Sequence, residues 1–356
     1  MQISAIDVTL VAVTSVTLVI PFVKGGLRMQ EKSIVLNKER KVTLTPFIAH
    51  HTITPAMLIL PGGGYNECSV REGAPVAEKF NRLGFNAFVL CYSVGNHYKW
   101  PYPLEDYEAA VRYIKENASS FCVDSSYIVA AGFSAGGHLA GAAATLSGEK
   151  PFAAIMCYPA ILKSTIGFAA PDAPDIADAV DDDTCPCFLA SSRNDWIVPI
   201  ENTHRLTDAF ERHYIDYESH IYGFSMHDFS IGKEVNAVPP KFCSRVGDWV
   251  EESVSWLNDL IDGSYISIRE SAAWQDAKAA TFSSKNSVGL IFGTEEAKKA
   301  FRRKCPQYYL LTEAARKKIG GYTEHVTLRN LLTFLNIKPE AYASIDEALK
   351  EIEIKR

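Results

Sequence analysis

The sequence predicts an α/β fold with a mainly parallel sheet, helices on both faces of the sheet, and a small all-helical C-terminal domain. Three observations predict it. From residue 32 onward, apolar strand-like runs alternate with segments of helical periodicity. Several of these runs are continuously apolar, which is typical of strands buried on both faces of a parallel sheet. After about residue 265 the strand-like runs stop and only helical patterns remain.

The expected strands share apolar, largely β-branched composition, and the expected helices share one apolar face. The strands are expected at 33–37, 41–48, 56–61, 86–92, 126–132, 152–158, 186–191 and 215–222. The helices are expected at 74–83, 103–118, 200–213 and 241–261, with an alanine-rich helix after residue 134. Residues 159–184 are rich in proline and aspartate, and we expect them to form a short polar cap over the carboxyl edge of the sheet.

The chain has 356 residues, more than one hydrophobic core usually supports. We expect residues 29–264 to form the main domain and residues 265–356 the helical one, in which Thr312, Thr327 and Ser344 are candidate N-caps.

The N-terminal stretch 8–23 is apolar, but it is short for a membrane span and lacks the basic region and cleavage site of a signal peptide. We therefore expect residues 1–28 to be an extension outside the fold, and the protein to be cytoplasmic. A poor signal sequence, which implies secretion, is the alternative.

Composition argues against several classes of partner. The net charge is −6 and no basic stripe is present, so neither a nucleic-acid nor a membrane partner is expected. The eight cysteines are scattered, and several lie in apolar runs typical of reduced core residues. The pair Cys185 and Cys187 has the wrong spacing for a CxxC motif, so we expect no metal and no other cofactor.

The strongest chemical signal is the segment Gly132-Phe133-Ser134-Ala135-Gly136, which lies between a buried strand and a helix. This context suits a nucleophilic serine on a sharp turn, because glycines leave room for the turn and expose the serine hydroxyl. The helix that follows offers N–H groups and a positive dipole end to an anionic intermediate. A glycine-rich helix entry with a capping serine is the structural alternative.

A second glycine segment, Gly62-Gly63-Gly64-Tyr65, follows the apolar strand 56–61. The N–H groups of Gly63 and Gly64, together with that of Ala135, are candidates for an oxyanion hole. A plain glycine turn is the alternative, and phosphate binding is disfavoured because no G-K-[ST] follows.

A serine nucleophile needs a base and an orienting acid, which in this arrangement follow it along the chain. Asp195 comes just after the strand 186–191, and His227 lies in the loop after the next strand. Both loops lie at the carboxyl edge of the sheet, where sites in open α/β sheets form. Asp228 and the run 181–183 compete with Asp195 for the role of acid.

These residues resemble the esterase/lipase branch of the α/β-hydrolases, of the BD-FAE type, which includes acetyl-xylan-esterase-like and feruloyl-esterase-like enzymes. The matching stretches include PGGGY, GFSAGGHLA, SRNDWIVP and YGFSMHDF, and the resemblance covers residues 30–262. It implies an α/β-hydrolase fold, a triad of Ser134, Asp195 and His227, and an oxyanion hole of Gly63, Gly64 and Ala135. Related lipase-type enzymes have His where Pro61 stands, and the short cap is a second departure.

The resemblance and the polar cap together predict a serine esterase for short acyl groups, above all acetyl, on a small-molecule or oligosaccharide alcohol. Aromatic side chains, chiefly Tyr65 and Trp196 and also Tyr98 and Trp100, are candidate flat surfaces for sugar rings, with simple packing under loops as the alternative. A prolyl-oligopeptidase-related peptidase and a non-catalytic binding protein on a hydrolase scaffold are the competing functions.

Overall fold

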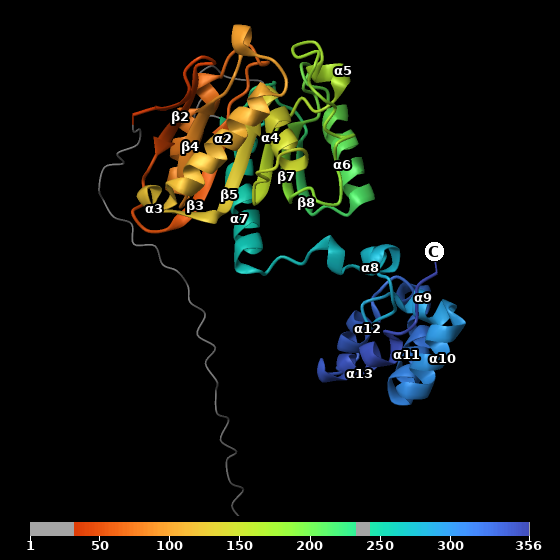
Figure 1. The fold of residues 1–356 in the computed structure, drawn as a ribbon. Coiled ribbons are helices and arrows are strands. Elements are labelled where there is room, and N and C mark those ends of the chain that lie inside the picture. Colours follow the sequence, from red (N-terminus) through yellow and green to blue (C-terminus); the bar gives the residue numbers. More distant parts are fainter. Residues whose placement is uncertain (1–31, 233–242, 356) are drawn as a thin grey trace, which may run out of the picture.

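The apolar runs form one eight-stranded sheet (Figure 1). The computed structural model describes residues 32–232 and 243–355. Within these residues the strand order is β1-β2-β4-β3-β5-β6-β7-β8. The strands are β1 Ile34–Asn37, β2 Val42–Phe47, β3 Thr54–Leu60, β4 Asn86–Cys91, β5 Val123–Phe133, β6 Ala153–Cys157, β7 Cys187–Ser192 and β8 Tyr217–Tyr222.

The sheet is mainly parallel, as the sequence predicts. The opening hairpin β1–β2 is antiparallel and joins β4 in antiparallel register, with Leu44 opposite Leu90. From β4 to β8 every neighbouring pair is parallel. The carboxyl ends of β3, β5, β6, β7 and β8 therefore meet at one edge, and the loops that carry the candidate site residues leave from this edge.

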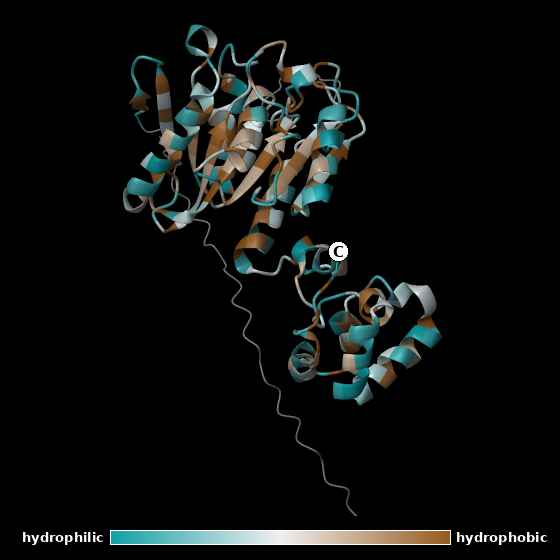
Figure 2. Cartoon of the chain, turned by 45° about the vertical axis from the view of Figure 1, so that its right-hand side comes forward, coloured by the Kyte–Doolittle hydropathy of each residue, from teal (hydrophilic) through white to brown (hydrophobic). Residues whose placement is uncertain are grey.

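Helices cover both faces of the sheet because side chains alternate along each strand. Leu58 and Leu60 of β3 pack into the core on one face, and Met57 and Ile59 pack into the core on the other. The first face is covered by α2 Tyr102–Glu116, α4 Ala135–Thr145 and α6 Glu201–His213, and the second by α1 Ala74–Arg82 and α7 Trp249–Asp262. Figure 2 shows the apolar strands inside and hydrophilic helix surfaces outside. The short helices α3 Ala118–Phe121 and α5 Lys163–Ile166 complete this part of the chain.

The last expected helix begins later than predicted. α7 starts at Trp249, whereas the sequence suggests residue 241. Residues 244–248 form turns with Val246 N–H bonded to the carbonyl of Cys243. Gly247 lies close to the backbone of Ile231, where a β-carbon would be 3.0 Å from the carbonyl oxygen. This close approach to the preceding loop fixes the chain direction before the helix can begin.

Residues after 265 are helical and have a core of their own, centred on Phe282, Phe301, Leu332 and Ile345. The helices are α8 Ala272–Lys278, α9 Val288–Gly293, α10 Glu295–Lys304, α11 Pro306–Ile319, α12 Leu328–Phe334 and α13 Glu340–Leu349. The segment that leads into them is bonded to the sheet edge, since Ser267 Oγ donates to the carboxylate of Asp216 at 2.6 Å.

Of the three N-caps expected in this region, only Thr327 caps a helix, accepting a hydrogen bond from Asn330 N–H at 3.0 Å. Thr312 lies inside α11, and its hydroxyl donates to the carbonyl of Tyr308 one turn back. Ser344 lies inside α13. Both predictions were wrong because helical periodicity continues through these positions, so no N-terminus is present there to cap.

The N-terminal segment 1–28, including the apolar stretch 8–23, lies outside the described residues. In the described part of the chain, no helix is both long enough and apolar enough to cross a membrane.

Candidate active site

Ser134 lies on a sharp turn between β5 and α4. Its backbone has φ 52° and ψ −114°, a conformation that non-glycine residues rarely adopt and that stores strain. The turn is held by its neighbours, because Ser134 N–H donates to the carbonyl of Cys157 and the Ser134 carbonyl accepts from the N–H groups of His138 and Ala160. The strand, turn and helix that the motif predicts are therefore all present.

The glycines on either side of Ser134 are required by close packing. A β-carbon on Gly132 would lie 2.0 Å from the carbonyl oxygen of Gly136. A β-carbon on Gly136 would lie 2.0 Å from the carbonyl oxygen of Leu60, at the end of β3. Because both obstacles are backbone atoms, no side-chain movement could relieve them. The start of α4 therefore packs directly on the end of β3, where the second glycine segment begins.

His227 lies between Ser134 and Asp195. Its Nδ1 is 2.6 Å from Asp195 Oδ2, and its Nε2 is 2.9 Å from Ser134 Oγ. A carboxylate can only accept, so Nδ1 carries the hydrogen, and Nε2 is left to accept the hydroxyl proton of Ser134. The Asp195 side chain is buried and the imidazole nearly so, which protects both hydrogen bonds from water.

Asp195 is fixed by its own loop. Its second carboxylate oxygen accepts from the N–H groups of Ile197 and Val198 at 2.9 and 3.0 Å. Asn194 links this loop to the histidine loop, because its side-chain oxygen accepts from Ser225 N–H at 2.9 Å.

The other candidates for the orienting acid form ion pairs with residues other than His227. Asp228 forms an ion pair with Arg71, although it is adjacent to His227 in sequence. In the run 181–183, Asp182 pairs with His213 and Lys278. Of the candidates, Asp195 is the one that the structure brings to His227.

The second glycine segment forms a tight loop beside Ser134. Gly63 and Gly64 have φ values of +125° and +61°, and a β-carbon on Gly63 would lie 2.3 Å from the carbonyl oxygen of Glu67. Ala135 is the first residue of α4, so its N–H is one of those that the helix itself leaves without a partner. The N–H of Gly62 is already engaged, since it donates to the buried carboxylate of Glu72 at 2.7 Å. Gly63, Gly64 and Ala135 thus stay the candidates for the oxyanion hole.

The expectation that Tyr65 presents a flat surface to sugars needs correction. Its ring is 1 % exposed, and its hydroxyl is 2.8 Å from Nδ1 of the fully buried His138. The ring also packs against Tyr98, whose hydroxyl donates to Asp172 of the cap. Tyr65 therefore joins the glycine loop to α4 and the cap. Trp196, the other candidate, is 75 % exposed next to Asp195.

Sequence patterns missed three polar residues at the site. They are Glu72, Tyr158 and Asn194, and each acts through bonds to segments far away in the sequence. For Glu72 the one available signal was an acidic residue, next to Arg71, just before the helix that begins at Ala74.

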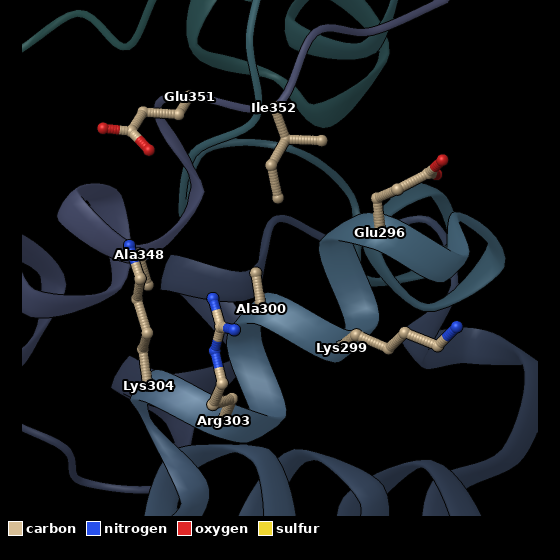
Figure 3. A pocket seen from close by; sticks show the side chains of 8 residues that line it. All are labelled: Glu296, Lys299, Ala300, Arg303, Lys304, Ala348, Glu351 and Ile352. Carbon is tan, nitrogen blue, oxygen red and sulfur yellow. The ribbon is translucent and has the colours of Figure 1, made fainter.

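A hollow of about 320 Å³ lies on the helical region, away from these residues (Figure 3). Its lining is of mixed charge and consists of Glu296, Lys299, Ala300, Arg303, Lys304, Ala348, Glu351 and Ile352. None of these eight residues belongs to the candidate active site.

Residues 45–165 match the BD-FAE family model. Two curated relatives are similar to part of the chain. Endo-1,4-beta-xylanase B of Butyrivibrio fibrisolvens is 31% identical over 209 residues, which cover 50% of this chain and 33% of the relative. Acetylxylan esterase of Xylanibacter ruminicola is 30% identical over 129 residues, which cover 35% of this chain and 27% of the relative. The chain thus spans about a third or less of the length of these relatives.

A solved structure matches over nearly its whole length. It is an alpha/beta hydrolase enzyme from a Medee basin deep-sea metagenome library, with 32% sequence identity and a TM-score of 0.61. The match covers 66% of this chain and 99% of the solved one. With the sheet order and the strand–turn–helix at Ser134, these similarities identify the fold. The chain belongs to the α/β-hydrolase family.

Proposed function

We propose that the protein is a serine esterase in which Ser134 is the nucleophile, His227 the general base and Asp195 the orienting acid. One observation carries this proposal. The hydrogen bonds Asp195–His227–Ser134 form a continuous chain that ends at the strained turn of Ser134. The similarity to proteins named as acetylxylan esterase and alpha/beta hydrolase supports the same chemistry.

The reaction follows from the geometry. His227 Nε2 takes the proton of Ser134 Oγ as the oxygen attacks the ester carbonyl carbon, and Asp195 stabilises the imidazolium. The carbonyl oxygen becomes an oxyanion, which the N–H groups of Gly63, Gly64 and Ala135 can stabilise. His227 protonates the leaving alcohol, and the acyl group stays on Ser134. Water, deprotonated by His227, then releases the acid and restores the serine.

We propose short acyl groups, above all acetyl, on a carbohydrate alcohol as the substrate class. The acetylxylan esterase relative supports the class of substrate. The cap supports the acyl length, because its aliphatic side chains Ile161, Ile166 and Ile176 pack into the main core. Its exposed side chains are largely aspartates, at 172, 178 and 181–183, and Phe168 is the one large apolar side chain of 159–184 that is exposed. A long acyl chain would need a continuous apolar face, on which each buried methylene contributes about 0.8 kcal/mol of binding free energy. The exposed Trp196 offers a ring face at the acid loop.

The nucleophile is tested first. Wild type and Ser134→Ala are compared in labelling by a fluorophosphonate probe and in hydrolysis of 4-nitrophenyl acetate. We expect labelling and turnover in wild type, and a loss of turnover of roughly 10⁴-fold or more in a folded Ser134→Ala variant. A folded variant with near-wild-type activity would refute the nucleophile, and an unlabelled, inactive wild type would favour the binding-protein alternative.

The acid is tested by a matched pair of substitutions. Asp195→Asn leaves His227 in the wrong tautomer, so kcat should fall by about 10⁴-fold. Asp228→Asn removes an ion pair with Arg71 and should have a mild effect. The reverse result would assign the acid to Asp228.

Substrate class is tested by the ratio of kcat/KM for acetyl and octanoyl esters of one alcohol. Acetyl release from acetylated xylo-oligosaccharides and hydrolysis of matched amides follow. A preference for octanoyl contradicts the short-acyl proposal, the absence of sugar deacetylation contradicts the carbohydrate proposal, and efficient amide cleavage favours the peptidase alternative.

A further inference from the structure

A buried carboxylate lies behind the candidate active site and contacts two of its loops. Glu72 is 2 % exposed. One of its oxygens accepts from Gly62 N–H at 2.7 Å, and the other accepts from the Tyr158 hydroxyl at 2.5 Å. A buried carboxyl group is costly unless both oxygens are bonded, so these two contacts explain how the fold tolerates it.

The first contact holds the glycine loop. Gly62 immediately precedes Gly63 and Gly64, and its own carbonyl accepts from Ser69 N–H at 2.9 Å. A β-carbon on Gly62 would lie 2.8 Å from the Glu72 carboxylate and 3.0 Å from Cβ of Ser134. The carboxylate therefore fixes the backbone at the point where the glycine loop passes the nucleophile.

The second contact reaches the base. The Tyr158 ring lies edge-on to the His227 ring, with 4.9 Å between centroids. Its hydroxyl also accepts from Ser230 N–H at 3.1 Å, three residues after the histidine. Tyr158 follows Cys157, whose carbonyl accepts from Ser134 N–H. The Tyr158 side chain thus contacts the histidine loop, and its backbone neighbour Cys157 bonds to the backbone of Ser134.

The residue before Glu72 contacts the same loop. The carbonyl of Arg71 accepts from Ser230 Oγ at 3.0 Å, and the Arg71 guanidinium pairs with Asp228. The Ser230 carbonyl in turn accepts from the indole N–H of Trp249 at 2.8 Å. The histidine loop is therefore bonded at Asp228 and at Ser230 to the segment that carries the carboxylate.

We propose that Glu72 is a positioning residue for catalysis, which aligns the glycine loop through Gly62 and His227 through Tyr158 onto Ser134. The inference rests on the proposed function. Its role is exerted through hydrogen bonds, so a side chain that preserves them should serve. Burial raises the pKa of Glu72, opposed by the bonds from Tyr158 and Gly62, in line with a group held by these two contacts.

The test compares Glu72→Ala, which removes both hydrogen bonds, with Glu72→Gln, whose amide oxygen can still accept from Gly62 N–H and whose amide N–H can donate to the Tyr158 oxygen. Displacing catalytic groups by about 1 Å costs on the order of 100-fold in rate, so kcat for 4-nitrophenyl acetate should fall about 100-fold in Glu72→Ala with KM nearly unchanged. Glu72→Gln should restore kcat to within a few-fold of wild type. Rates are normalised to folded protein measured by near-UV circular dichroism.

Tyr158→Phe keeps the inference testable if Glu72→Ala does not fold. It removes one buried hydroxyl and should lower kcat about 10-fold, on the scale of a small misalignment. Tyr107→Phe is the matched control, because Tyr107 is also fully buried and its hydroxyl donates to the Glu149 carbonyl, away from the three candidate triad residues. Its kcat should equal that of wild type.

The inference is overturned if Tyr158→Phe keeps the kcat of the Tyr107→Phe control, if folded Glu72→Ala keeps wild-type kcat, or if Glu72→Gln is as slow as Glu72→Ala. These outcomes differ from a failure of the proposed function, in which wild type itself lacks esterase activity or folded Ser134→Ala retains it.

Discussion

Protonation of His138 should destabilise the protein in mildly acidic solution. The imidazole is fully buried, with Nε2 3.0 Å from the Pro174 carbonyl and Nδ1 2.8 Å from the Tyr65 hydroxyl. A carbonyl can only accept, so Nε2 carries the hydrogen and Nδ1 accepts from the tyrosine. Burial lowers the pKa of His138 from 6.5 to about 4. The folded protein therefore keeps this histidine neutral over a range in which the unfolded chain protonates it.

The size and sign of the effect follow from linkage. Below pH 6.5 the unfolded chain binds a proton at this position and the folded protein does not, so stability falls as pH decreases until about pH 4. A pKa shift of this size lowers the free energy of unfolding by about 3 kcal/mol at pH 4. About 2.5 kcal/mol of this is already lost at pH 4.5.

The assay is urea unfolding of wild type and His138→Gln at pH 7.0, 5.5 and 4.5. Glutamine can still donate to Pro174 but does not titrate, so the variant shares every other pH effect. The difference in unfolding free energy between the two proteins should shrink by about 2.5 kcal/mol from pH 7.0 to 4.5. A constant difference across this range would refute the assignment of a neutral buried histidine.

Three further predictions concern other parts of the chain. Gly136→Ala should destabilise the protein by about 3 kcal/mol or more, because its β-carbon meets the backbone of β3. Gly223→Ala, which meets nothing within 4 Å, is the control, and equal melting temperatures would contradict the packing argument. A hydrogen bond from the Cys68 thiol lowers the pKa of Cys91. Cys91 therefore carries more thiolate than an ordinary cysteine, and its alkylation by iodoacetamide at pH 7.5 should slow in Cys68→Ala; mass spectrometry of the labelled peptides checks this, and an unchanged rate argues against it. A chain ending at residue 264 should still hydrolyse a small ester, since none of the candidate triad residues lies beyond that point; a folded but inactive truncation would show that the helical region is needed.

Local patterns predicted most of the sheet because each strand carries its own signal. The apolar runs at β3 to β7 and the helical periodicity of α2 and α6 need no knowledge of distant residues. The start of α7 was misplaced because contacts between Gly247 and the preceding loop, which the sequence does not display, decide it. The domain boundaries at 28 and 264 stay predictions.

The candidate triad could be predicted because each member follows a strand end, a position that the sequence marks. Glu72 and Tyr158 could not, because their partners come from loops 10 to 86 residues away. Tyr65 was misinterpreted for a similar reason. An aromatic residue next to a glycine loop is compatible with a binding surface, and only its bond to His138, 73 residues away, shows that the ring is internal.

The two glycine motifs act as one structural unit. Gly136 leaves room for the backbone of Leu60, and Gly62 leaves room for the Cβ of Ser134. Each motif therefore occupies space that a side chain on the other would fill. The N–H groups of the glycine loop and the serine hydroxyl are consequently set at a fixed separation by backbone contact, which flexible side chains could not provide. The alignment of the glycine loop with the serine can then be adjusted only by polar groups that bond to this backbone. The Glu72 carboxylate is one of them, because it accepts from Gly62 N–H and also contacts the histidine loop through Tyr158.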